Sequence, residues 1–134
     1  MKPLKILIIL TLPFFMISCL DDDDYPNNGG GTDLAEKFLG VWHVYEPDKK
    51  LNYDVTIKRH LNSNTDVDLI NFADVGNAKG MCVNNTIVIE NQQLGNYYTV
   101  EGTGYYENKK KLTFSYTLSD GIDSEVRTAI FTRE

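Results

Sequence analysis

Beyond about residue 38, hydrophobic side chains recur at every second position, and this period of two constrains the fold of the chain more than any other feature. The clearest run covers residues 112–118, where Leu112, Phe114 and Tyr116 alternate with threonine and serine. Successive side chains of a β-strand point to opposite faces, so this run predicts a strand with one buried and one solvated face. The same alternation in the other runs indicates an all-β domain.

Clusters of asparagine, aspartate and glycine, such as residues 84–85 and 119–121, separate about eight of these runs. Short strands with tight, regularly spaced connections are typical of a sandwich or a barrel. Connection hairpin by hairpin favours a small eight-stranded antiparallel up-and-down barrel, because closure removes exposed strand edges. An open β-sandwich is the alternative. Residues 32–37 contain the only helical pattern, one turn that Thr32 or Asp33 would cap with Glu36 reaching back.

The first 18 residues have the features of an export signal. Lys2 and Lys5 form a positively charged start, and residues 6–17 are almost wholly apolar. Twelve apolar residues are too few for a membrane-spanning helix, which needs about 20. We therefore expect residues 1–18 to be a signal peptide that is removed.

The segment that closes this signal, Met16-Ile17-Ser18-Cys19, resembles the lipobox of bacterial lipoproteins. In that family a diacylglycerol alkylates the cysteine thiol, the preceding peptide is cut off, and the new amine is often acylated. The resemblance implies that Cys19 is the lipid-bearing N-terminus, labelled by palmitate. With Cys19 modified, we expect Cys82, between two apolar residues, to be a buried small side chain and not a disulfide partner.

Residues 19–36 are predicted to be a flexible tether, because they contain four consecutive aspartates and three consecutive glycines. An acidic run behind the acylated cysteine resembles the surface-export signal of lipoproteins in the Bacteroidota. That resemblance implies an anchor in the outer leaflet of the outer membrane, on the cell surface. A solvating spacer on a periplasm-facing lipoprotein is the alternative. Residues 37–134 form the predicted β domain.

The start of the β domain, residues 38–44, contains Gly40-Val41-Trp42 and looks like the Gly-x-Trp opening of the lipocalin-like families. The resemblance implies that Trp42 plugs the closed end of the barrel and that Gly40 lets the chain pass close to it. Small lipoproteins of gut Bacteroidota are also similar in a segment like residues 70–72 and in a glycine-rich strand like residues 102–104.

The formal net charge of −6 and the lack of a basic stripe argue against a nucleic-acid partner. His43 and His60 are the only histidines, and no metal-ligand spacing or nucleophile motif includes them, so we predict no metal, no cofactor and no enzymatic activity. Adjacent strand tyrosines point to opposite faces, so one of each pair should be exposed and available to a ligand or partner. The candidates are Tyr97, Tyr98, Tyr105 and Tyr106.

These features lead to one main hypothesis and two alternatives. The main hypothesis is a non-enzymatic binding or accessory module, held to the membrane through Cys19, that contacts a surface protein, a glycan or a small apolar ligand. The first alternative is a lipocalin-like carrier of a small apolar ligand in an internal pocket. The second is a hydrolase with a histidine beside a carboxylate in a cleft. Bulky inward side chains look sufficient to fill a small barrel, namely Val55, Ile57, Ile87, Ile89, Leu112 and Phe114.

Overall fold

The computed structural model describes residues 32–134, of which Leu34–Glu134 form one compact unit. The predicted signal peptide, the lipidation site Cys19 and most of the predicted tether lie outside the described residues. No helix within residues 32–134 is both long enough and apolar enough to cross a membrane.

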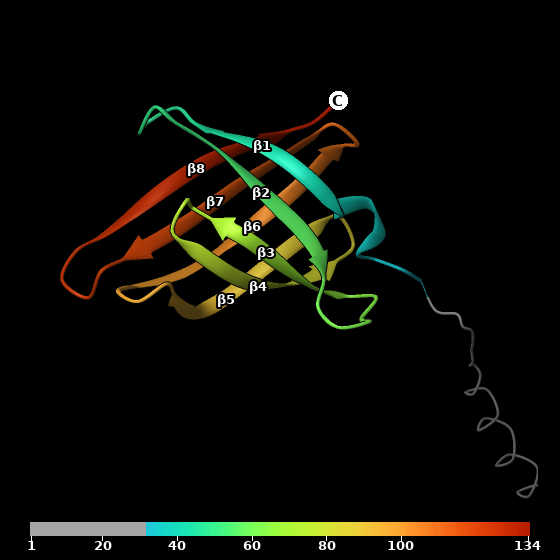
Figure 1. Ribbon diagram of the computed structural model, residues 1–134, viewed down its shortest axis with the longest axis horizontal. Coiled ribbons are helices and arrows are strands. Elements are labelled where there is room, and N and C mark those ends of the chain that lie inside the picture. The colour runs from blue at the N-terminus through green and yellow to red at the C-terminus, as the bar shows by residue number, and fades with distance from the viewer. Residues whose placement is uncertain (1–31) are drawn as a thin grey trace, which may run out of the picture. The chain divides into compact units, whose positions relative to one another are not determined.

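Eight antiparallel strands follow one another in chain order and close into a barrel (Figure 1). Each strand pairs with the next, and β8 returns to pair with β1 through Val44 and Phe131. The predicted up-and-down barrel is confirmed, and the open sandwich is wrong. The strands are β1 (Gly40–Glu46), β2 (Leu51–Arg59), β3 (Asp66–Phe72), β4 (Gly76–Val83), β5 (Thr86–Leu94), β6 (Tyr98–Asn108), β7 (Lys111–Ser119) and β8 (Ser124–Thr132).

The two ends of the barrel carry different elements, and we call them the sealed end and the mouth. The sealed end carries the short 3-10 helix η2 (Glu36–Phe38) and the turns at residues 60–65, 84–85 and 109–110. The mouth carries the turns at residues 47–50, 73–75, 95–97 and 120–123, and lies at the left of Figure 1. The described chain enters the barrel at the sealed end.

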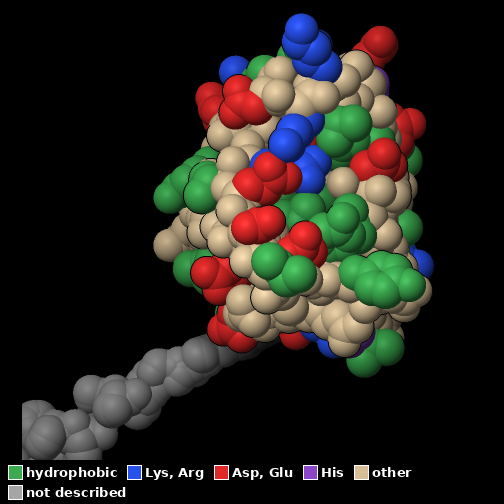
Figure 2. Space-filling model, turned by 90° about the vertical axis from the view of Figure 1, so that its left-hand side faces the viewer, with side chains coloured by type: hydrophobic (Ala, Val, Ile, Leu, Met, Phe, Trp, Pro, Cys, Tyr) green, Lys and Arg blue, Asp and Glu red, His purple; other side chains and the backbone are tan. Residues whose placement is uncertain are grey.

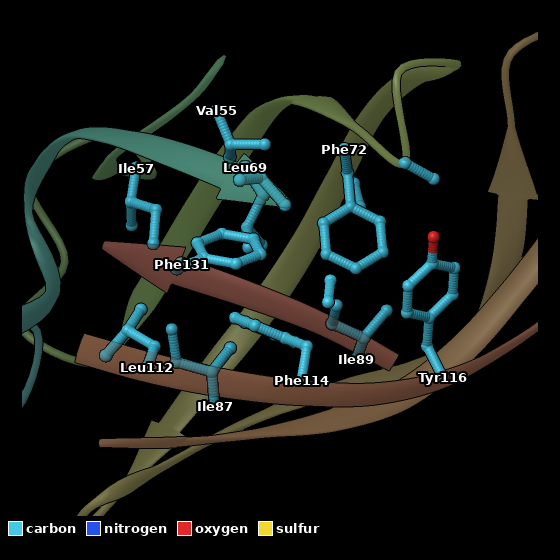
Figure 3. Packing of buried hydrophobic residues seen from close by; sticks show 14 of the residues in the cluster. Val55, Ile57, Leu69, Phe72, Ile87, Ile89, Leu112, Phe114, Tyr116 and Phe131 are labelled. Carbon is cyan, nitrogen blue, oxygen red and sulfur yellow. The ribbon is translucent and has the colours of Figure 1, made fainter. Parts of the chain in front are cut away.

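Large inward side chains fill the middle of the barrel. The rings of Phe114 and Phe131 have centroids 4.6 Å apart, and Phe72 meets the ring of Tyr116 edge-on at 4.9 Å. Figure 3 shows these rings pointing toward one another from β3, β7 and β8, with Ile87 and other aliphatic side chains beside them. An eight-stranded barrel is just wide enough for side chains to fill it, and these residues do so.

Gly104 on β6 makes room for this packing. A Cβ atom at this inward position would collide with the ring of Phe114 on the neighbouring strand. At Gly102 a Cβ atom would collide with the main chain of β7 at Tyr116. The glycine-rich segment therefore lets β6 and β7 bend tightly around a large aromatic core.

One extra residue in β3 changes which side chains face inward. Leu69 pairs with Ala78 and Phe72 pairs with Gly76, so three steps on β3 match two on β4. Asn71, at the irregularity, has φ of 71°, and its side-chain N–H donates to the carbonyl oxygen of Asp54 at 3.0 Å. This bulge lets Val67, Leu69 and Phe72 all point into the core, although their spacing is not a regular two.

The predicted capping of the first helical turn is wrong. The residue before η2 is Ala35, and no side chain caps the turn. Glu36 instead forms an ion pair with Arg59 of β2, with 2.7 Å between Oε1 and the guanidinium nitrogen. The carboxylate of Glu36 therefore pairs with an arginine of β2 and does not cap the helical turn.

Candidate binding site at the mouth of the barrel

Trp42 lies fully buried near the sealed end. Its indole N–H donates to the carbonyl oxygen of Phe38 in η2 at 2.9 Å. The guanidinium carbon of Arg133 lies 3.8 Å from the centre of the Trp42 ring. Arg133 also donates to the carbonyl oxygens of Leu39 at 2.6 Å and Lys37 at 3.0 Å. These contacts hold η2, β1 and the C-terminal residues together at the sealed end.

Near the mouth, a buried carboxylate organises a polar cluster that the sequence analysis did not identify. Glu46 is 1% exposed and accepts hydrogen bonds from the hydroxyl groups of Tyr53 and Tyr116, the latter at 2.5 Å. Its other oxygen pairs with Nε of Arg127 at 2.8 Å. We call Glu46, Tyr53, Tyr116 and Arg127 the mouth cluster.

The period of two already contained a signal for this cluster. Glu46 has the same parity as Trp42 and Val44 on β1, and Arg127 has the same parity as Phe131 on β8. Both charged side chains therefore point into the barrel, as the core side chains do. Burying an unpaired charge is costly, so an inward glutamate is expected to pair with an inward arginine.

The two tyrosines of the mouth cluster hold their protons tightly. Burial, followed by the hydrogen bond to Glu46, raises the pKa of Tyr53 and of Tyr116 well above the ordinary value for tyrosine. A tyrosine in the unfolded chain titrates near pH 10. The stability that depends on these protons is therefore complete below about pH 10 and is lost as the pH rises above it.

We expect the free energy of unfolding to fall steeply above about pH 10, and to fall less steeply in a variant that carries both Tyr53→Phe and Tyr116→Phe. Urea denaturation between pH 8 and pH 11 measures this slope. Tyr97→Phe is the matched control, because Tyr97 is 80% exposed and should leave the slope unchanged. An identical alkaline slope in the double variant and the wild type would contradict the assignment.

An open depression of about 290 Å³ lies at the mouth. Glu125 on its wall connects it to the mouth cluster, because this carboxylate lies 2.8 Å from Nζ of Lys49 and 3.6 Å from Arg127. Figure 2 looks onto this end and shows acidic, basic and hydrophobic side chains mixed on one face. The depression is lined by Tyr98, Leu118, Asp120, Asp123, Ser124 and Glu125.

The carboxylate of Asp120, in the mouth depression, is already engaged by hydrogen bonds within its own turn. Asp120 accepts hydrogen bonds at 2.9 Å from the main-chain N–H groups of Asp123 and Ile122, and these bonds hold the pKa of Asp120 below its usual value. Its carboxylate therefore shapes the turn. The hydroxyl of Ser124 and the ring of Tyr98 add a polar group and an aromatic surface to the same depression.

The four candidate tyrosines do not form one surface. Tyr97 is 80% exposed in the turn before β6, and Tyr98 is half-buried at the mouth. Tyr105 is 57% exposed on the outer wall, whereas Tyr106 is half-buried and meets Phe38 edge-on at the sealed end. The two pairs lie at opposite ends of β6, so they cannot contact one small ligand together.

Each histidine lies beside a carboxylate on the outside of the barrel. His43 is 3.2 Å from Asp54, and His60 is 2.9 Å from Asp68. Neither histidine borders the mouth depression. Within residues 32–134, no group of three or more histidine, cysteine, aspartate or glutamate side chains is placed to hold a metal ion.

No protein-family model and no curated protein matches the chain. Two solved structures are similar to it. One is EF1p2_mFAP2b bound to DFHBI, with a TM-score of 0.56 and 13% identity over 76% of this chain and 98% of that one. The other is a redesigned beta barrel, b11L5F_LGL, with a TM-score of 0.51 and 20% identity over 76% of this chain and 96% of that one. At these identities the similarity shows the fold, a small eight-stranded antiparallel barrel.

Proposed function

We propose that this protein is a lipid-anchored, non-enzymatic binding module that recognises its partner at the mouth of the barrel. The observation that carries the proposal is the difference between the two ends. At the sealed end, Trp42 and Arg133 tie η2 to the strands. At the mouth, a buried charged cluster lies beside an open depression lined by aromatic, hydroxyl and carboxylate groups.

The place where the chain joins the barrel supports this orientation. The main-chain N–H of Ala35 donates to the carbonyl oxygen of Asn64 at 2.9 Å, next to the sealed end. A tether that begins at a lipidated Cys19 would therefore join the barrel at the end opposite the mouth. Two or more acyl chains hold a protein firmly in a membrane. The acidic run at residues 21–24 supports placement of that anchor on the surface of the outer membrane.

Exposed hydrophobic side chains in two turns of the mouth support contact with a partner protein. Ile122 is 90% exposed in the β7–β8 turn, and Tyr97 is 80% exposed in the β5–β6 turn. The two turns are neighbours, because Thr99 of β6 pairs with Ser119 of β7 beside them. Large exposed side chains beside a depression are typical of recognition surfaces.

A carrier of a small apolar ligand is the second candidate. EF1p2_mFAP2b has this fold and is bound to a ligand, DFHBI, which favours the idea that such a barrel can hold a small molecule. The close ring contacts of Phe72, Phe114 and Phe131 support the binding module over the carrier, because an internal ligand would have to displace them.

Photo-crosslinking on intact cells tests the orientation of the module. We expect benzoylphenylalanine at position 122, in the mouth, to yield a crosslinked product. The same group at position 61 should yield none, because Leu61 is equally prominent, at 82% exposed, but lies in a turn of the sealed end. Equal products from both positions, or none from position 122, would refute recognition at the mouth.

A further inference from the structure

A second concave surface lies on the outer wall of the barrel, away from the mouth cluster. It is a shallow groove of about 350 Å³ across β5, β6 and β7. We call it the wall groove. The side chains that border it and point outward are Val88, Glu90, Glu101, Thr103, Ser115 and Thr117.

The strand register explains why the wall groove is hollow and polar. Val88 pairs with Thr103, and Thr103 pairs with Ser115, so small hydroxyl side chains lie side by side on adjacent strands. Glu101 pairs with Thr117 in the next row. Neighbouring strands lie about 4.8 Å apart and successive outward rows about 6.6 Å apart, so the hydroxyl groups form a regular array.

The hydroxyl array continues beyond the groove in both directions. Thr99 pairs with Ser119 toward the mouth, and Ser115 pairs with Thr128 on β8. On the sealed-end side, the row that follows Thr103 places Tyr105 beside Thr113. Tyr105 is 57% exposed and lies outside the residues that line the groove, one outward row beyond Thr103 and so about 6.6 Å from it.

The charges of the wall groove restrict the class of ligand. Two carboxylates, Glu90 and Glu101, border the groove, and no lysine or arginine is among its lining residues. An anionic ligand would therefore be repelled. The amide of Asn91 donates to Oε1 of Glu101 at 3.2 Å, and because a carboxylate has about four acceptor positions, Glu101 can accept further hydrogen bonds.

We propose that the wall groove binds a neutral glycan chain. The carboxylates accept hydrogen bonds from sugar hydroxyl groups, the threonine and serine hydroxyls donate or accept, and the Tyr105 ring packs against the apolar face of a sugar ring. A basic peptide would use the carboxylates, whereas the extended array of uncharged hydroxyl groups matches the many hydroxyl groups along a sugar chain. This proposal does not rest on recognition at the mouth, which uses other residues.

Affinity electrophoresis of the full-length protein tests the proposal, with xylan, β-glucan, mannan or galactan in the gel and polylysine as the cationic probe. We expect at least one neutral polysaccharide to retard the protein, equally at low and high salt. Tyr105→Ala and Glu101→Gln should each weaken this binding by about tenfold or more. Tyr45→Ala, which removes an exposed tyrosine of β1 away from the wall groove and the mouth depression, is the matched control and should bind as the wild type does.

Three results would overturn the proposal. One is the absence of retardation by all four polysaccharides, and another is glycan binding that neither groove variant weakens. The third is binding to polylysine alone that salt abolishes, which would assign the carboxylates to a cationic ligand. Unchanged thermal midpoints of both variants show that any loss of binding is local. A failure here leaves the crosslinking at position 122 unaffected, so the two proposals are judged separately.

Discussion

Glu46→Ala is expected to destabilise the barrel by about 3–5 kcal/mol, because it leaves the buried charge of Arg127 with only the more distant and half-exposed carboxylate of Glu125. Glu46 is 1% exposed and Arg127 is 7% exposed, so both charges depend on protein partners and not on solvent in the folded barrel. The hydroxyl groups of Tyr53 and Tyr116 lose their acceptor in the same variant. Single domains are stable by only about 5–15 kcal/mol, so urea denaturation should show a large shift of the midpoint.

Two further variants separate the charge from the hydrogen bonds in this prediction. Glu46→Gln keeps an acceptor for the tyrosines but loses the charge, and the double variant Glu46→Gln with Arg127→Met should cost less than the sum of the single changes. Glu125→Ala is the matched acidic control, since its carboxylate is 43% exposed, and it should cost no more than about 1 kcal/mol. A loss below 1 kcal/mol in Glu46→Ala would show that the mouth cluster does not hold the barrel together.

Cys19→Ala is expected to abolish incorporation of labelled palmitate completely. The reason is that the predicted lipobox contains no other thiol that could receive the proposed acyl chains. Metabolic labelling with palmitate measures this effect.

The second cysteine supplies the matched control for this experiment. Cys82 is 2% exposed on β4, so Cys82→Ala should keep the palmitate label. The lipid-anchor proposal fails if the label persists in Cys19→Ala or disappears only in Cys82→Ala. It also fails if mass spectrometry finds a mature N-terminus at any residue other than Cys19.

The local pattern of the sequence was sufficient to predict strands, turns and the choice of barrel. The alternation at residues 112–118 predicts the strand seen as Lys111–Ser119, and the turn residues at 84–85 and 119–121 mark strand ends. These features depend on side-chain parity and on turn-forming residues, and both involve only residues that are close together in the sequence. The inward parity of Glu46 and Arg127 is also visible in the sequence, but parity alone does not show that the two side chains meet.

Only the tertiary structure shows which residues of different strands lie side by side, and the wall groove and the mouth cluster depend on these pairings. The pairing of Thr103 with Ser115, and so the wall groove, follows from register between strands rather than from either strand alone. The bulge at Asn71 shifts the register between β3 and β4 and turns Phe72 inward. The meeting of Glu46 with Arg127, 81 residues apart, likewise required the closure of β8 onto β1. By itself the sequence determined the strands and their two faces; only the closed barrel determined their neighbours, because those contacts form between segments far apart in the chain.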